Sequence, residues 1–189
     1  IAVKTPPIDA ERRAVVPDRV ELPRVYMSWI TSPIFMEGDA EADVASVVLG
    51  DGRSSRLYKS LVYDKQIAQA VSAEQYSLIL GSVFTIEATA RPGHTAEELE
   101  RALEAELTRL RETGPEPAEV ARARNTIETR IVQQLETLGG FGGVADRLNS
   151  YNHYLGTPGY LEQDITRYRR VTPDGVVEAV KGISLSIHQ

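Results

Sequence analysis

The first half of the chain shows the hydrophobic alternation that is typical of β-strands. Residues 82–90 alternate cleanly between apolar and polar side chains, which predicts a strand with one buried face. Residues 24–34 are rich in β-branched and aromatic side chains and lie between two prolines, so they predict a second strand. Because this stretch is apolar on both faces, we expect it to be central and covered. Residues 67–80 predict a third strand, which a turn at Gly81 joins to residues 82–90.

The second half of the chain has the period of α-helices. Thr95 and Glu98 form a capping box, and leucines then follow at helical spacing. The four glycines of LGGFGG interrupt a later helix, since each glycine costs about 1 kcal/mol in a helix interior. We expect helices at residues 39–49, 55–63, 96–113, 117–138, 144–155, 160–170 and from 173 onward. The final residues, SLSIHQ, predict the start of a last strand.

Strands followed by helices predict an α+β domain, with an antiparallel-rich sheet that helices cover on one side. The Pro-rich residues 1–23 predict a linker with an edge strand around residues 14–16, and residues 24–189 predict one domain. The length of 189 residues is close to that of a single large domain. Because the sequence does not begin with Met, we expect it to be a piece of a longer polypeptide.

Composition narrows the classes of function that the chain can serve. A net charge of −6 argues against nucleic acid as a partner, and no apolar run approaches the roughly 20 residues of a membrane span. With no cysteine, the chain cannot form thiolate zinc sites, disulfides or Cys nucleophiles. The histidines, His94, His153 and His188, are too scattered to form a metal-binding pair on one helix. We therefore predict no catalytic residue and no metal ligand in this segment.

The stretch DGRSSRLYKSL, residues 51–61, looks at first like a phosphate loop. It lacks the Gly-x4-Gly-Lys-Ser/Thr pattern and the third glycine of a dinucleotide fingerprint. The favoured interpretation is that Gly50 or Gly52 ends one helix in a left-handed turn and Ser54 or Ser55 caps the next. A weaker alternative is an unrelated binding module that holds an anion at its two arginines, Arg53 and Arg56.

Two stretches carry a resemblance to a known family. LGDGRSSRLYKSLVYDKQIAQAVSA and TLGGFGGVADRLNSYNHYLGTPGY, with the later RVTPDGV, resemble the C-terminal domain of the M16 zinc metallopeptidases. This is the family of pitrilysin, insulinase and the mitochondrial processing peptidase, and the resemblance extends from about residue 20 to 180. It implies half of a clamshell with the LuxS/MPP-like metallohydrolase fold, in which two α+β halves enclose a chamber.

The resemblance also indicates which chemistry lies elsewhere. Family members hold zinc with His-x-x-Glu-His in an N-terminal domain, and this motif is absent here. The family's Arg and Tyr, seven residues apart, correspond to Val62 and Gln69, which cannot take over their roles. The resemblance leaves the following residues as candidates for lining the substrate chamber: Gly52, Arg53, Ser54, Arg56, Tyr58 and Gln69.

The function that the resemblance implies is that of a non-metal-binding C-terminal domain in a zinc metalloendopeptidase. The segment alone is predicted to be inactive and to hold no cofactor, with zinc implied only for the parent protein. Its expected partners are an N-terminal zinc-bearing domain or a partner M16 subunit, together with a peptide substrate. An exposed docking surface would favour a dimer. The alternative is a proteolytically inactive assembly subunit of the same fold. The family suggests export to the periplasm, with the cytoplasm left open.

Overall fold

Three antiparallel strands form the sheet of this protein. The computed structural model describes residues 10–185, and within them the sheet comprises β1 (Arg24–Thr31), β2 (Ala68–Tyr76) and β3 (Ser82–Ala90). Their order is β1-β3-β2, so the strand with the cleanest alternation lies at the centre. The register places Trp29 opposite Phe84 and Ala73 opposite Ile86.

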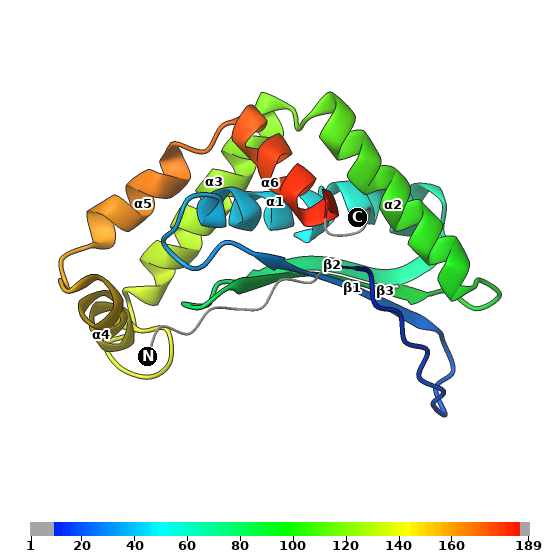
Figure 1. Cartoon of the computed structure of the whole chain (residues 1–189), viewed down its shortest axis with the longest axis horizontal. Helices are drawn as coiled ribbons and strands as arrows, with labels where there is room; N and C mark the ends of the chain where they lie inside the picture. Colours follow the sequence, from blue (N-terminus) through cyan, green and yellow to red (C-terminus); the bar gives the residue numbers. More distant parts are fainter. Residues whose placement is uncertain (1–9, 186–189) are drawn as a thin grey trace.

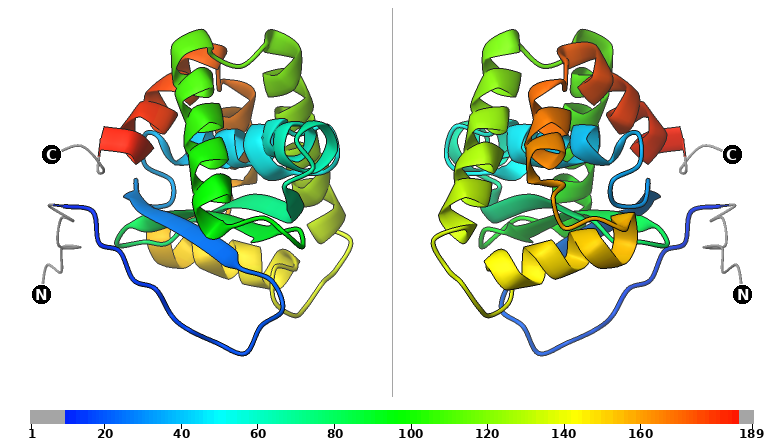
Figure 2. Two further views of the ribbon diagram at one scale, coloured as in Figure 1. Left: turned by 90° about the vertical axis from the view of Figure 1, so that its right-hand side faces the viewer. Right: turned by 90° about the vertical axis from the view of Figure 1, so that its left-hand side faces the viewer.

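Helices cover one face of this sheet (Figure 1). They are α1 (Asp39–Gly50), the short π-helix η1 (Tyr58–Asp64), α2 (Ala96–Thr113), α3 (Pro117–Gln134), α4 (Val144–Leu155), α5 (Leu161–Arg169) and α6 (Pro173–Leu185). The predicted α+β class is confirmed. One helix departs from the one-sided arrangement, because α4 lies on the opposite side of the sheet plane in both views of Figure 2.

The core lies between the sheet and the helices. Every second residue of β3 is buried, and Phe84 and Ile86 are fully inaccessible. Burying side chains of this size contributes about 1.5–3 kcal/mol each. The predicted capping box is confirmed at the start of α2, where Thr95 accepts from the Glu98 backbone N–H and the Glu98 carboxylate accepts from the Thr95 N–H at 3.0 Å.

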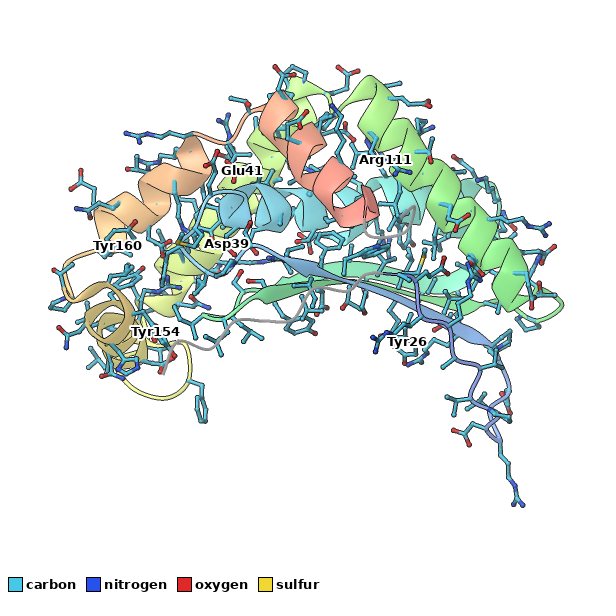
Figure 3. All side chains as sticks on the ribbon, in the orientation of Figure 1. Tyr26, Asp39, Glu41, Arg111, Tyr154 and Tyr160 are labelled. Atoms are coloured by element: carbon cyan, nitrogen blue, oxygen red, sulfur yellow. The ribbon has the colours of Figure 1, made fainter. Side chains whose placement is uncertain are left out.

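Strand β1 differs from the sequence prediction. It is an edge strand rather than a central one, and one face is open, since Tyr26 is 60% exposed and Ile30 is 37% exposed. The prediction was wrong because an apolar second face was taken as a sign of cover by the same chain. This face instead carries exposed side chains of mixed polarity, and Figure 3 shows Tyr26 beneath the sheet.

The segment that precedes β1 also differs from the prediction. Residues 11–18 form no strand, so the edge strand expected around residues 14–16 is not in the described sheet. Val15 is 94% exposed, and the segment is tied back through Arg13, whose guanidinium lies 2.5 Å from the Glu100 carboxylate. Figure 1 shows it bending away from β1. Apolar β-branched residues alone therefore did not make a strand here, because no ladder partner holds them.

Some other elements end at residues that differ slightly from the predicted ones. The strands end at Thr31 and Tyr76, earlier than predicted, because the following residues form a loop in which the Ile34 N–H donates to the Leu78 carbonyl at 2.9 Å. Residues 184 and 185 continue α6 instead of starting a strand. The rest of the predicted final strand lies outside the described residues.

Candidate functional site

The turn between α1 and η1 folds as a helix end followed by a hydrogen-bonded turn. Gly52 has a φ of +72°, which favours glycine, and the Ser55 hydroxyl donates to the Gly52 carbonyl at 2.7 Å. Gly50 lies so close to β2 that a Cβ there would be 2.1 Å from the Ala73 nitrogen. The turn is therefore shaped by backbone packing, and the predicted left-handed glycine is found at Gly52. The predicted serine cap is not found, because η1 has no side-chain cap and the Ser55 hydroxyl donates back into the turn.

Arg56 is engaged by a carboxylate. Its Nε donates to Glu119 Oε1 at 3.0 Å, and its Nη2 donates to Glu119 Oε2 at 2.7 Å and to the Gly114 carbonyl at 2.9 Å. Burial opposes ionisation of Glu119, but these hydrogen bonds and one from the Glu116 backbone lower the pKa of its carboxyl overall. Arg56 thus fastens the turn to the α2–α3 junction. Of the two arginines that the anion-binding alternative needs, only the exposed Arg53 would remain to bind an anion.

Removing this fastening is expected to destabilise the fold. Arg56→Ala deletes charge-assisted hydrogen bonds at a side chain that is only 10% exposed, so we expect the free energy of unfolding to fall by about 2–3 kcal/mol. Arg53→Ala is the matched control and should change it by less than about 0.5 kcal/mol. Urea unfolding followed by circular dichroism measures both. Equal effects of the two substitutions would contradict this assignment.

Gln69 lies apart from the other candidates for lining a chamber. It lines a groove of about 1730 Å³ between residues 11–22, β1 and the start of α2, and it sits where β2 has a register shift. Gly52, Arg53 and Ser54 are exposed beside α3, where Arg122 donates to the Ser54 carbonyl. Tyr58 is half-buried against the core. The six residues do not form one site, and a chamber role for them stays a prediction.

The open face of the sheet carries a network of polar and aromatic side chains. The Arg24 guanidinium lies 2.9 Å from the Glu87 carboxylate and donates to the Tyr26 hydroxyl at 3.1 Å. Ser28 and Thr85 share a hydrogen bond of 3.0 Å across the strands. This face combines fixed polar groups with exposed aromatic surface, a mixture found where proteins dock.

A buried ionic cluster joins α1, α4 and α5, and the sequence analysis missed it. Arg167 donates from Nε to Asp164 at 2.6 Å and from Nη1 to Asp39 at 2.5 Å. Asp39 is fully buried and also accepts from Ser77 and from the Phe35 N–H at 3.1 Å. Figure 3 shows Asp39 at the start of α1, facing the side of the molecule that carries α4 and α5.

The cluster continues to α4 through Asp164. The Tyr151 hydroxyl donates to Asp164 Oδ2 at 2.5 Å, and Arg147 donates to the same oxygen at 3.1 Å. Burial and the bond to Asp164 raise the pKa of Tyr151 to about 12. Phe35 and Tyr160 pack edge-on or tilted against Tyr151 with ring centroids about 6 Å apart. Tyr151 therefore connects α4 to the rest of the domain.

Asp43 completes the cluster. The Tyr168 hydroxyl donates to Asp43 Oδ2 at 2.6 Å, and Arg167 Nη2 donates to the Tyr168 oxygen at 2.7 Å. Burial raises the pKa of Asp43 to about 7, and the neighbouring Asp39 adds to the rise. The signal in the sequence was the pair Asp39 and Asp43, four residues apart and so on one face of a helix that is otherwise mostly apolar.

A raised carboxyl pKa makes stability fall as pH rises. The folded chain keeps a proton on Asp43 that the unfolded chain loses near pH 4, so stability is lost between about pH 4 and pH 7 at up to ~1.4 kcal/mol per pH unit. We expect Asp43→Asn, which cannot ionise, to gain stability relative to the wild type over this range. Thermal unfolding of both proteins from pH 4 to pH 8 measures the difference. A difference that does not change with pH would contradict the assignment.

The described residues do not offer a metal site. No group of three or more His, Asp or Glu side chains in residues 10–185 is placed to hold a metal ion. His94 pairs with Glu98, His153 stacks on Tyr154, and His188 lies outside the described residues. The donor set of a catalytic zinc, three protein ligands with an open position, is therefore not provided by this part of the chain. None of its helices is long and apolar enough to cross a membrane.

Comparison with known sequences gives two related matches. A family model described as "Peptidase M16 inactive domain" matches residues 2–127. "Zinc protease PqqE" of Helicobacter pylori is 29% identical over 163 residues, which cover 85% of this chain and 36% of that protein. The chain thus spans about a third of the length of this curated relative.

Solved structures share the fold at lower identity. A protease from Helicobacter pylori superposes with a TM-score of 0.81 at 23% identity, over 95% of this chain and 42% of that one. The inactive peptidase domain of a Bordetella parapertussis protein assigned as a zinc protease gives 0.73 at 22% identity, over 88% of each chain. A chain in Complex III2 from Candida albicans gives 0.66 at 19% identity, over 85% of this chain and 40% of that one.

Proposed function

This chain belongs to the M16 peptidase inactive-domain family, and we propose that it forms one wall of a peptide-enclosing chamber in a zinc peptidase. The zinc would be held by another half, either elsewhere in a longer polypeptide or in a partner subunit. Two observations motivate this division. The described residues lack a set of zinc ligands, and the Helicobacter relatives are more than twice as long as the part that matches.

The observation that carries the proposal is the exposed apolar surface of α4. Tyr151 is the one buried residue of this helix, whereas Leu148 is 41% exposed and Tyr154 is 45% exposed. The preceding glycine loop adds Leu138 and Phe141, both fully or largely exposed. A helix that projects past the sheet and buries so little against its own chain is expected to be stabilised by a second body.

The open face of the sheet offers a second docking surface. Figure 1 shows this face flanked by α4 at one end and by residues 10–23 at the other. Exposed apolar side chains also gather at the β2–β3 turn, where Leu78, Ile79 and Leu80 are each about half exposed. Together these features give a wall with an apolar rim, which suits contact with another half around an enclosed peptide. In this arrangement Gln69 would face the enclosed space through the groove that it lines.

The chemical contribution of such a wall is positional. Zinc, when bound in the other half, would activate the water that attacks the peptide bond. This chain's residues would enclose an extended peptide and limit its access to solvent, which favours productive orientation. Val62 is buried at the position that corresponds to the family's arginine, so it makes no polar contact with a substrate.

A second candidate function is an assembly subunit without proteolytic activity. It is favoured by the shared fold with a chain of Complex III2 from Candida albicans. In that case the other half would also lack His-x-x-Glu-His. Sequencing the adjoining coding region distinguishes the two functions, because an intact motif supports the peptidase and its absence supports the assembly subunit.

The apolar surface of α4 gives the test. The double variant Leu148→Glu, Tyr154→Glu places two carboxylates on this surface, and we expect it to weaken binding to the other half at least tenfold. The chain alone should self-associate as its concentration rises, and the double variant should reduce this association. Sedimentation velocity of the chain alone and in the mixture measures both effects.

The matched control is Tyr63→Glu, which adds a carboxylate at an exposed tyrosine on η1. It should leave both associations unchanged. A wild-type chain that stays monomeric at every concentration and does not bind the other half would contradict the proposal. Equal binding by the double variant and the control would contradict the role of α4.

A further inference from the structure

The cluster around Arg167 has one more carboxylate than it has cations. Asp39, Asp43 and Asp164 face the two guanidinium groups of Arg147 and Arg167. The side chains of Asp39 and Asp164 are almost fully buried, and Arg167 is 17% exposed, so bulk water screens the excess charge poorly. The cluster is electrically balanced when one of its carboxylates carries a proton.

The geometry indicates which carboxylate holds this proton. Asp39 and Asp164 each have direct contact with a guanidinium group, whereas Asp43 reaches Arg167 only through the Tyr168 hydroxyl. The groups that act on Asp43 are Asp39 from its own helix and Asp164, Arg167 and Tyr168 from α5. Helix α1 also packs against α3, α6 and β2. The charged groups that act on Asp43 come from α1 and α5.

The same cluster is the main attachment of α4. Tyr151 and Arg147 bind Asp164, and Asp164 binds Arg167, which in turn binds Asp39 at the start of α1. Phe35 adds to this attachment in an uncommon conformation. Its φ is +66°, its N–H donates to Asp39, and the Arg167 guanidinium lies 5.3 Å from its ring centroid. Because Arg167 belongs to α5, a shift of α5 would be transmitted to Asp39 at the start of α1 and to Phe35, which supports Tyr151.

We propose that this cluster is a proton-dependent latch, which holds α4 and α5 against α1 while Asp43 is protonated and releases them when Asp43 ionises. An ionised Asp43 would add a third negative charge around Arg167 and compete for it with Asp39 and Asp164. Moving α5 away hydrates Asp43 and separates it from Asp164 on α5, so ionisation favours the released arrangement. The latch concerns this chain alone and holds whether or not the chain forms a chamber wall.

The linkage has a definite direction. In the latched arrangement Asp43 is protonated up to about pH 7, and in the released arrangement its carboxyl would ionise near pH 4. The released fraction therefore rises with pH across this interval, by up to about tenfold per pH unit, and levels off above pH 7. Acidic conditions therefore hold α4 and α5 against α1, and neutral conditions release them.

Spin labels provide a direct test because the chain has no cysteine of its own. Exposed Asn152 on α4 and exposed Glu112 on α2 are each replaced by Cys and labelled, and the distance distribution is measured at pH 5 and pH 8. We expect one narrow distance at pH 5 and a second, broader population at pH 8. In the Asp43→Asn background the narrow distance should persist at both pH values.

A distance distribution that is the same at pH 5 and pH 8 in a folded protein would overturn the proposal. So would an Asp43→Asn protein that responds to pH as the wild type does. Arg167→Lys provides a second variant, since Lys keeps the charge but cannot bridge Asp39 and Asp164 in the same way. It should show the broader population already at pH 5, and a narrow distribution there would also count against the latch.

Discussion

Arg167→Leu is expected to lower the free energy of unfolding by about 3–5 kcal/mol. The substitution leaves Asp39 and Asp164 buried without their shared cation, and an unpaired buried charge costs far more than the pair itself contributes. It also removes the stacking of the guanidinium on the rings of Phe35 and Tyr168. Urea unfolding at pH 6, where the cluster is intact, measures the loss.

Arg170→Leu is the control for this experiment. Arg170 lies three residues further along and its side chain is exposed, so the same chemical change should alter stability by less than about 0.5 kcal/mol. Lowering the pH should partly rescue Arg167→Leu, since protonation removes the unpaired charges. A loss below about 1 kcal/mol for Arg167→Leu would show that the cluster contributes little to the fold.

Gly50→Ala is expected to destabilise the domain by about 3 kcal/mol or more. A Cβ at this position would lie 2.1 Å from the Ala73 nitrogen and 2.8 Å from its Cα, distances at which the backbone of α1 or β2 has to move. Overpacking in a core costs about 1–3 kcal/mol when side chains can adjust, and here the obstacle is backbone. Thermal unfolding would show the change as a lower Tm.

Gly182→Ala serves as the matched control because it lies within α6 and has no atom within 4 Å of its added Cβ. Alanine is the better helix former by about 1 kcal/mol, so this variant should be as stable as the wild type or more stable. If both alanine variants unfold at the same temperature, the close approach of α1 to β2 is not what requires a glycine at position 50.

Local sequence signals predicted most of the helical and strand elements. The alternation of residues 82–90 gave the central strand with its bounds, and the capping box at Thr95 gave the start of α2. Both signals depend on neighbours in the sequence, and the structure leaves them undisturbed. Helix α3 ends at Gln134, a few residues earlier than the end at residue 138 that the apolar spacing suggested.

The errors arose where the outcome depends on contacts between distant segments. Nothing within residues 24–31 shows whether their second apolar face is covered, so the edge position of β1 could not be read from them. The ionic cluster brings Asp39 next to Arg167, 128 positions away, and only the packing of α5 on α1 creates it. The helices and strands could therefore be predicted from the sequence better than which side chains the fold buries or leaves exposed.

The division of labour between two halves is tested most directly by measuring bound zinc and peptide cleavage for this chain, for the half that carries His-x-x-Glu-His, and for their mixture. The account predicts that zinc resides in the other half, that this chain alone neither binds zinc stoichiometrically nor cleaves peptides, and that cleavage increases when the two are combined. Zinc binding and cleavage by this purified chain alone would contradict it.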